Sequence, residues 1–459
     1  MSSGIAGICL LFVAALFGHA QPGGPFPPLP PGSGPLPKIL DRYPDSPSIS
    51  PTSTIPVGPL GFSVPGENYL LRRESLVSLD FLGEDRILFT FRVPRLMQRD
   101  AADNSDDKKQ QIQALVLSLS TGKIESRATW TVPDRSRYLW MLNDGHFLLR
   151  VDDGLDEGDA QLQMKPNLRV DGRLLWIEMD PMQQVMIANS LEPADASQKT
   201  TESKASESNP GERGSSEQNA PELGSATGPP TEPSAATIDR HKPLRQSVLV
   251  ARTEKLGTGE VMHESRVPWT NQTSDWPMNS EGYLETSLDK ADQWLLELNS
   301  YSGGSRVLTR IESSCPPQYN FVSESELLLM TCDPDSGWNL KAVSTRGDSF
   351  WETRTAMNAM VPLLVTASNG LRVARETMLL KRSVDKYKRL VGAQDFQGQI
   401  VKVFNAADGK MVLESPLTPI FDGGGNVAIS PSGQRAAILN AGAIQVFQLP
   451  APPSVPGSH

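Results

Sequence analysis

The chain has 459 residues with a formal net charge of −10, and 38% of its residues are hydrophobic. The negative charge disfavours a nucleic-acid partner, because binding to a phosphate backbone requires a basic surface. The 38 prolines and 37 glycines exceed what one packed core accommodates, so long segments are expected to lie outside the folded part.

The first 20 residues have the pattern of a signal peptide. An apolar run over residues 5–17 is followed by Gly18, His19 and Ala20, with small residues at the positions that a signal peptidase reads. We expect cleavage after Ala20 and no membrane span afterwards, because the run is shorter than the roughly 20 apolar residues that cross a bilayer. No lysine or arginine precedes the run, which leaves an uncleaved anchor as the alternative.

Three further segments have compositions typical of chain without a core. Residues 21–65 are rich in proline, which favours extended polyproline II and predicts a disordered linker. Residues 191–243 are rich in Ser, Glu, Pro, Gly and Thr and contain no aromatic residue, which predicts a disordered insertion. Residues 453–459 form a tail. The folded domain is therefore expected over residues 66–452.

Two kinds of strand–turn–strand unit alternate through this domain. The first kind occurs seven times, with its paired strands at residues 76–81 and 86–91, 138–142 and 147–151, 174–179 and 185–188, 276–278 and 283–284, 319–322 and 327–331, 363–366 and 371–374, and 427–429 and 436–439. The second kind has a glycine turn, for example at Gly259, Gly304 and Gly347, which are 45 and 43 residues apart. This period is expected of the four-stranded blades of a β-propeller.

Two segments, residues 427–439 (VAISPSGQRAAIL) and 403–410 (VFNAADGK), resemble the repeats of WD-repeat, YVTN and quinoprotein-like propellers. The resemblance covers roughly residues 66–450 and is generic, since the chain has no Trp-Asp dipeptide. We predict an all-β fold, a seven-bladed β-propeller of four-stranded antiparallel blades, with a pair of β-sandwiches or a solenoid as alternatives. The last unit is one strand short, and residues 68–72 are expected to supply that strand and close the ring.

Cys315 and Cys332 flank the predicted turn at Ser323 and Glu324. If those two residues form the turn, residues paired across the hairpin have numbers that sum to 647, as 315 and 332 do. The two cysteines would then lie at a distance that a disulfide can bridge, in an export compartment that permits one. The alternatives are two free buried cysteines, or a catalytic or metal pair, which the lack of nearby His or Cys partners disfavours.

Two charged segments are candidate binding loops. The acidic residues between 152 and 159 offer oxygen ligands that calcium favours, but their spacing fits no recognised calcium loop, so we expect a solvated loop. A basic patch could meet an acidic surface or anionic lipid, with a solvated loop or a short helix as alternatives. Its residues are Lys381, Arg382, Lys386, Lys388 and Arg389.

The three long insertions, at about residues 95–112, 191–243 and 381–398, each fall between the second and third strand of a predicted blade, so they should share one face. No catalytic, cofactor or metal site is predicted, because the chain contains none of the hydrolase, zinc-protease, dinucleotide or phosphate-loop motifs. We therefore expect an exported, periplasmic or extracellular, monomeric and non-catalytic propeller that binds a protein or surface component through that face. The alternative is a propeller enzyme, a quinoprotein-like oxidoreductase or a hydrolase, with its site in the central channel.

Overall fold

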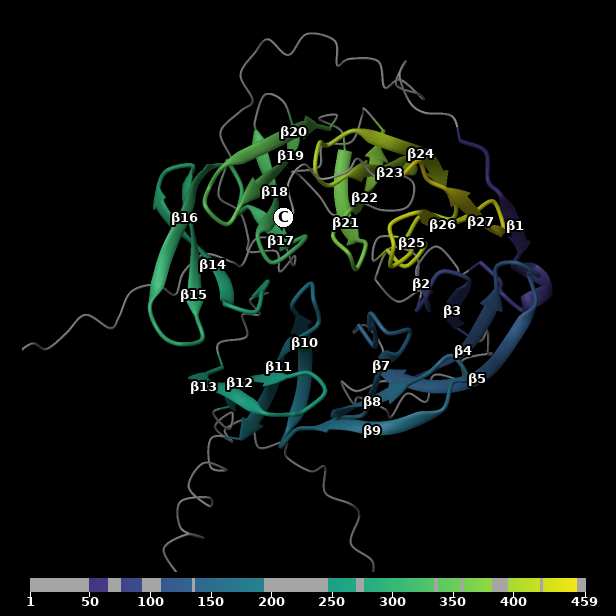
Figure 1. Cartoon of the computed structure of the whole chain (residues 1–459), viewed down its shortest axis with the longest axis horizontal. Helices are drawn as coiled ribbons and strands as arrows, with labels where there is room; N and C mark the ends of the chain where they lie inside the picture. Colours follow the sequence, from purple (N-terminus) through teal and green to yellow (C-terminus); the bar gives the residue numbers. More distant parts are fainter. Residues whose placement is uncertain are drawn as a thin grey trace, which may run out of the picture.

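The computed structural model describes residues 49–64, 76–92, 109–133, 137–193, 247–269, 276–333, 337–355, 359–381, 395–421 and 424–451. These residues form seven antiparallel sheets arranged as blades around a central axis, which confirms the predicted seven-bladed β-propeller (Figure 1). The predicted signal peptide, most of the linker, most of the insertion and the tail lie outside the described residues.

The strands of each blade are given from the channel outward. Blades 1 to 3 consist of β2 (Ser78–Phe81), β3 (Arg86–Arg92), β4 (Lys109–Ser118) and β5 (Ile124–Pro133); β6 (Leu139–Met141), β7 (Phe147–Val151), β8 (Gly154–Gly158) and β9 (Met164–Arg169); and β10 (Arg173–Met179), β11 (Val185–Pro193), β12 (Ser247–Lys255) and β13 (Val261–Pro268). Blades 4 and 5 consist of β14 (Gly282–Lys290), β15 (Gln293–Ser300) and β16 (Ser305–Glu312); and β17 (Gln318–Phe321), β18 (Glu326–Asp333), β19 (Gly337–Ser344) and β20 (Ser349–Arg354). Blades 6 and 7 consist of β21 (Ala359–Thr366), β22 (Arg372–Leu380), β23 (Phe396–Asn405) and β24 (Met411–Leu417); and β25 (Val427–Ile429), β26 (Arg435–Asn440), β27 (Ala443–Gln448) and β1 (Ser53–Pro56). A 3-10 turn, η1 (Gly58–Leu60), follows β1.

Blade 4 has three strands among the described residues, which differs from the four-stranded prediction. Where its innermost strand would lie, the structure has one bridge, between Met278 and Tyr283. The neighbouring Pro277 has no N–H to donate to a ladder, although its carbonyl accepts the Leu284 amide at 2.8 Å. The inner edge of this blade is therefore paired over a shorter length than those of its neighbours.

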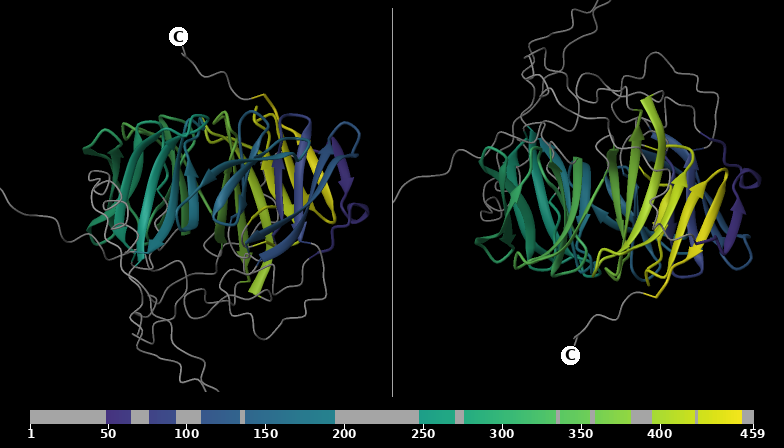
Figure 2. Two further views of the ribbon diagram at one scale, coloured as in Figure 1. Left: turned by 90° about the horizontal axis from the view of Figure 1, so that it is seen from below. Right: turned by 90° about the horizontal axis from the view of Figure 1, so that it is seen from above.

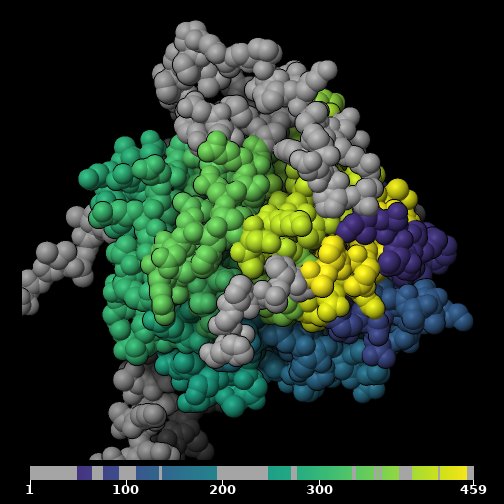
Figure 3. All heavy atoms as spheres, turned by 45° about the horizontal axis from the view of Figure 1, so that its top comes forward, coloured from purple at the N-terminus to yellow at the C-terminus, as the bar shows by residue number. Residues whose placement is uncertain are grey.

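The ring closes through β1, which pairs with β27 so that Ser53 lies opposite Val446. In the space-filling view the purple N-terminal segment lies against the yellow C-terminal blade (Figure 3). The prediction that an N-terminal strand completes the last blade is confirmed, but the choice of residues 68–72 is wrong, since β1 supplies it from the segment expected to be linker. The proline-rich composition concealed this strand. As the outermost strand, β1 tolerates Pro56, because no further strand needs that residue's N–H.

Apolar side chains packed between neighbouring sheets hold the blades together. In β3, Ile87 and Phe89 pack in the cluster shared with blade 7, whereas Leu88 packs in the cluster shared with blade 2. Side chains alternate across a strand, and both faces of a blade are covered, so the middle strands are apolar at consecutive positions. This burial on both sides explains the apolar runs that the sequence repeats.

The propeller has two different faces, because strands run across its thickness in alternating directions (Figure 2). One face, called here the turn face, carries the short connections between first and second strands, for example residues 82–85 and 322–325. The opposite face, called here the insertion face, carries the long connections of blades 1, 3 and 6, which leave β3, β11 and β22 and return at β4, β12 and β23. All three lie between a second and a third strand, as predicted.

Candidate functional site

The inner strands surround a central channel with a cavity of about 620 Å³, to which all seven blades contribute residues. A cavity of this volume is in the range of small-molecule sites in proteins. Among the residues that line it, Asp80, Glu178 and Asp180 are acidic and Arg137 is basic. The channel therefore has an acidic lining contributed mainly by blades 1 and 3.

Asp80 lies in β2, on the channel wall of blade 1. It keeps partial contact with solvent, yet it is surrounded closely enough that burial raises the pKa of its carboxyl above the ordinary value. A hydrogen bond from the Ser78 hydroxyl and the positive charge of Arg137 act on the pKa in the opposite direction. Arg137 itself lies over the Trp140 ring, 5.5 Å from its centroid, and donates to Leu139 O at 3.2 Å.

Tyr138 connects blades 1 and 2 beside Asp80. Its hydroxyl lies 2.7 Å from Thr90 Oγ1 and donates to Leu76 O at 3.1 Å. Burial raises the pKa of this hydroxyl well above its ordinary value, so it stays neutral. The Tyr138 hydroxyl is thus held within the channel wall by its neighbours.

Asp180 lies at the start of the turn between β10 and β11, and only 1% of its surface is exposed. Its Oδ1 accepts the Gln184 and Val185 amides at 2.6 Å each, and its Oδ2 accepts the Met182 amide at 3.0 Å. Burial, and then the charge of Glu324, raise the pKa of this carboxyl to about 6, against the hydrogen bonds from the Val185 and Gln184 amides. Asp180 therefore shapes its own turn.

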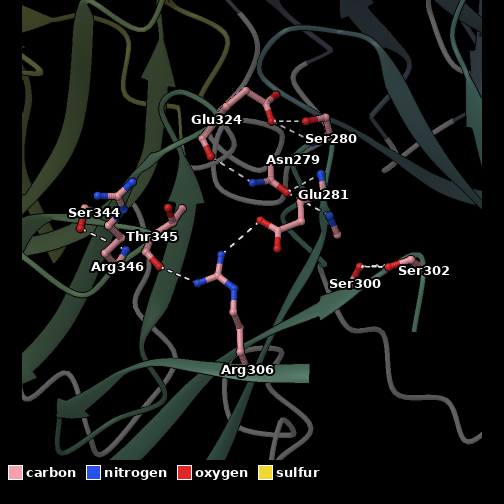
Figure 4. Close-up of polar contacts among 11 residues, drawn as sticks. Asn279, Ser280, Glu281, Ser300, Ser302, Arg306, Glu324, Ser344, Thr345 and Arg346 are labelled. Atoms are coloured by element: carbon pink, nitrogen blue, oxygen red, sulfur yellow. Dashed lines mark hydrogen bonds and ion pairs between the residues drawn. The ribbon is translucent and has the colours of Figure 1, made fainter. Parts of the chain in front are cut away.

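Glu324 and Arg306 join blades 4 and 5 on the turn face (Figure 4). Glu324 Oε2 accepts the Ser280 amide at 2.9 Å and the Ser280 hydroxyl at 2.6 Å, and Glu324 O accepts Asn279 Nδ2 at 3.0 Å. Arg306 donates to Glu281 Oε2 at 3.1 Å and to Thr345 O at 2.9 Å. The contacts of Glu324 connect residues 44 and 45 positions apart in the sequence, which is one blade, whereas those of Arg306 span 39 and 25.

The predicted cysteine pair lies at disulfide distance, with Sγ atoms 1.99 Å apart and Cα atoms 5.5 Å apart. The predicted register is wrong by one residue. The hairpin pairs Gln318 with Met330, whose numbers sum to 648, because the last pair of the ladder, Phe321 with Leu327, leaves five residues rather than two between the strands. Cys315 precedes β17, where Ser313 Oγ accepts the Cys332 amide at 3.0 Å and holds this segment beside β18.

Of the five residues in the predicted basic patch, the structure describes Lys381. Its side chain is exposed, and its amide donates to Asp395 O at 2.9 Å, where the connection from β22 returns to β23. Arg382, Lys386, Lys388 and Arg389, and with them the predicted short helix, lie outside the described residues. The grouping of these cations remains a prediction.

The acidic segment of blade 2 forms strand β8, so the prediction of a solvated loop is wrong for most of it. Asp156 pairs with Arg169, while Glu157 contacts His146 Nδ1 at 2.8 Å and Lys165 Nζ at 2.9 Å. These carboxylates therefore make their charged contacts within the blade.

In the part of the chain that is described, no three His, Cys, Asp or Glu side chains converge in a way that could hold a metal. That part also contains no helix long and apolar enough to span a membrane.

No family model matches this chain, and no curated protein matches its sequence. Among solved structures, it is similar to the uncomplexed Pyrococcus horikoshii acylaminoacyl peptidase, with 10% identity and a TM-score of 0.43 over 83% of this chain and 52% of that one. It is also similar to Kuenenia stuttgartiensis hydrazine synthase (10% identity, TM-score 0.40, 82% and 96% of the two chains) and to the β-propeller domain of Myceliophteria thermophila Cps50 (Swd1) (10%, 0.40, 88% and 100%). The chain spans about half the length of the peptidase. Likenesses this distant indicate no function.

The sequence did not single out Asp80, Asp180 or Glu324 as functional candidates. Asp180 and Glu324 both occupy the turn between the first and second strand of a blade, so each was interpreted as an ordinary turn residue. The recurrence of acidic residues in this turn of the repeat is the signal that could have singled them out. Asp80 has no such signal, because Arg137, the charged residue that acts on it, comes from another blade.

Proposed function

We propose that this protein is an exported, non-catalytic propeller that binds a protein or surface component through its insertion face. The observation that supports the proposal is the difference between the two faces. Three long connections leave and return on the insertion face, and long loops on a rigid scaffold commonly carry binding function. On this face, blades 2, 4 and 7 have two-residue connections between the same strands, so the long ones are additions to a complete fold.

The turn face, by contrast, is occupied by contacts between blades. Gln183 Oε1 accepts the Asn143 amide at 2.5 Å, and Arg435 donates to Glu84 O at 2.7 Å and to Asp85 Oδ1 at 2.6 Å. Together with the contacts of Glu324 and Arg306, these bonds link several neighbouring blades. Their polar groups are already partnered, which favours the insertion face as the contact surface.

Export is part of the proposal. The cysteine pair at disulfide distance is compatible with an oxidising compartment, where disulfides persist. The predicted signal peptide over residues 1–20 supports the same location. Secretion of the intact chain, followed by a thiol assay without reductant, tests this part separately from binding.

A propeller enzyme is the second candidate, and Asp80 is the observation in its favour. A channel carboxyl whose pKa is raised by burial is a common feature of active sites. Against it, the Ser78 hydroxyl already donates to Asp80, and Arg137 is held by Leu139 O and Trp140. An oxidoreductase or hydrolase activity that is lost in Asp80→Asn would favour the enzyme.

Site-specific photo-crosslinking in the exporting cell tests the binding face. A photoreactive amino acid is placed at Pro193 or Lys381 on the insertion face, and at Asp85 or Lys410 on the turn face as matched controls; all four residues are exposed. Adducts from the insertion-face positions alone are expected. Adducts from the turn-face positions alone, or none from Pro193 and Lys381, would overturn the proposal.

Loop replacement provides the second test. An Asn-Gly turn, which suits a tight antiparallel connection, can join Pro193 to Ser247 or Leu380 to Phe396, because these residues are already paired across their ladders. At least one replacement is expected to lower adduct yield by about tenfold while the melting temperature is retained, since the blades remain intact. Full adduct yield in both variants would argue against these two loops as the contact.

A further inference from the structure

Asp80 and Arg137 present opposite charges to the central cavity from neighbouring blades. In β2, Leu79 and Phe81 pack in the cluster shared with blade 7. Side chains alternate across a strand, so Asp80, between those two residues, points toward blade 2. Arg137 belongs to blade 2, where it precedes β6, and both charged residues line the cavity of about 620 Å³. The carboxyl and the guanidinium therefore face the same enclosed space.

These two charges do not pair with each other. Arg137 is close enough for its charge to act on the pKa of the Asp80 carboxyl, yet no ion pair joins the two side chains in the described part of the chain. Asp80 Oδ2 accepts the Ser78 hydroxyl, which leaves Oδ1 for a ligand. Arg137 donates from Nε to Leu139 O at 3.2 Å, which leaves Nη1 and Nη2. One acceptor and two donors are thus available at the cavity.

Both groups are held in place before any ligand arrives. The Ser78 hydroxyl fixes one oxygen of the Asp80 carboxyl, and the Arg137 guanidinium lies over the Trp140 ring, 5.5 Å from its centroid. Groups that are already positioned lose little conformational freedom on binding, which favours affinity.

The other carboxyl groups of the cavity are already engaged. Asp180 is 1% exposed, and its oxygens accept the amides of its own turn. Glu178 already interacts with another residue. The hydroxyl of Tyr138, next to Arg137, donates to Leu76 O and stays neutral. Asp80 is therefore the acidic group of the cavity that is best placed to receive a cation.

Much of the remaining lining is apolar. It includes Met141, Met179, Met278, Phe321 and Val365, which come from five different blades. Methionine side chains are flexible and adapt to ligands of different shape. An apolar cavity with a few positioned polar groups is the usual form of a small-molecule site.

We propose that the central channel binds a small zwitterion, an amino acid or a dipeptide with apolar side chains, whose ammonium pairs with Asp80 and whose carboxylate pairs with Arg137. Asp80 is the residue before the turn-face end of β2, whereas Arg137 precedes the insertion-face end of β6. The ammonium end of the ligand therefore points toward the turn face. Burial raises the pKa of the Asp80 carboxyl, and an ammonium beside it compensates for that burial. This site does not depend on the partner proposed for the insertion face.

Isothermal titration calorimetry of the full chain tests the site, with leucine and leucyl-leucine as probes. At least one of the two is expected to bind with a dissociation constant below about 1 mM. The N-acetyl derivative of that probe has no ammonium, and the C-terminal amide has no carboxylate. Each derivative should bind at least about tenfold more weakly, because each loses a charged hydrogen bond.

Two variants assign the charges to their residues. Asp80→Asn should weaken binding of the zwitterion at least about tenfold and leave binding of the N-acetyl derivative unchanged. Arg137→Met keeps an apolar stem near Trp140 and should do the same with respect to the C-terminal amide. The matched controls are Asp171→Asn and Arg127→Met, which alter exposed side chains outside the cavity lining and should bind as the wild type does.

The proposal is overturned if neither probe binds the wild type, or if both derivatives bind as tightly as the zwitterion. Wild-type affinity in both Asp80→Asn and Arg137→Met would also overturn it. Thermal denaturation shows whether each variant is folded. Should a variant fail to fold, the comparison of the zwitterion with its two derivatives on the wild type decides the question alone.

Discussion

Thr52 is hydrogen-bonded twice to Val446, which lies 394 residues further along the chain. The Thr52 amide donates to the Val446 carbonyl at 2.7 Å, and its hydroxyl donates to the same oxygen at 3.0 Å. These bonds begin the pairing of β1 with β27 and join the two ends of the propeller. The seven blades therefore depend on a four-residue strand for closure.

Removing residues 1–57 should destabilise the propeller by about 3–6 kcal/mol, since burial of a large aliphatic side chain contributes about 1.5–3 kcal/mol and both Ile55 and Val57 are buried. The outer edge of β27 would also be exposed to edge-to-edge association. Urea denaturation and light scattering measure the two effects. A chain that starts at Ile49 is the control and should match the full-length protein, and equal stability of the two truncations would contradict this role of β1.

Glu376→Gln should change how stability depends on pH. Glu376 is fully buried in β22, its Oε2 accepts Gln399 Nε2 at 3.2 Å, and burial raises the pKa of its carboxyl from 4.5 to about 8. Because the folded-state pKa is raised, the stabilisation from this group is complete in acid and declines by up to about 1.4 kcal/mol per pH unit until the pH passes about 8.

The expected result is equal stability of wild type and Glu376→Gln near about pH 4, with the variant more stable by about 2–4 kcal/mol near about pH 8. Denaturant titrations across this range provide the measurement. Glu125→Gln, which alters an exposed ion pair with Arg86, is the control and should leave the slope unchanged. Parallel stability curves for wild type and Glu376→Gln would show that the buried carboxyl does not titrate in this range.

Loss of the cysteine pair should weaken blade 5 without abolishing the fold. The bridge closes a segment with a sequence separation of 17 residues, and disulfides of this span contribute about 3 kcal/mol. The backbone bond between the Ser314 amide and Cys332 O remains when both cysteines are replaced by alanine. Reductant should lower the denaturation midpoint of the wild type and leave that of the double variant unchanged. Insensitivity of the wild type to reductant would argue against the bridge.

Gly409→Ala should be more costly than Gly259→Ala, although both glycines occupy the same turn position with φ near +65° and +66°. A Cβ on Gly409 would lie 2.5 Å from the Trp351 ring, whereas a Cβ on Gly259 would meet no atom within 4 Å. The shared strain of a left-handed alanine is about 1 kcal/mol, and the clash should add about 1–3 kcal/mol. Thermal denaturation of both variants makes the comparison, and equal losses would show that Trp351 moves aside freely.

The sequence predicted the propeller because its evidence is local and repeated. Strands such as β3 and β26 are apolar at consecutive positions and are followed by turns at a nearly constant spacing. The same spacing placed the three insertions between second and third strands. Cys315 and Cys332 could be paired in advance because they flank one hairpin, where small errors of register leave partners within reach. For each of these features, the residues that decide the outcome lie within a single repeat.

Only the tertiary structure revealed β1 as the closing strand and brought Glu324 to Asn279 and Ser280. The composition around Ser53–Pro56 is that of a proline-rich linker, and its partner β27 lies at the other end of the folded chain. Glu324 belongs to blade 5 and its partners Asn279 and Ser280 to blade 4, so their contact depends on how neighbouring blades pack around the ring. The sequence by itself determined the repeating units, whereas contacts between distant repeats were decided by how the units close into a ring.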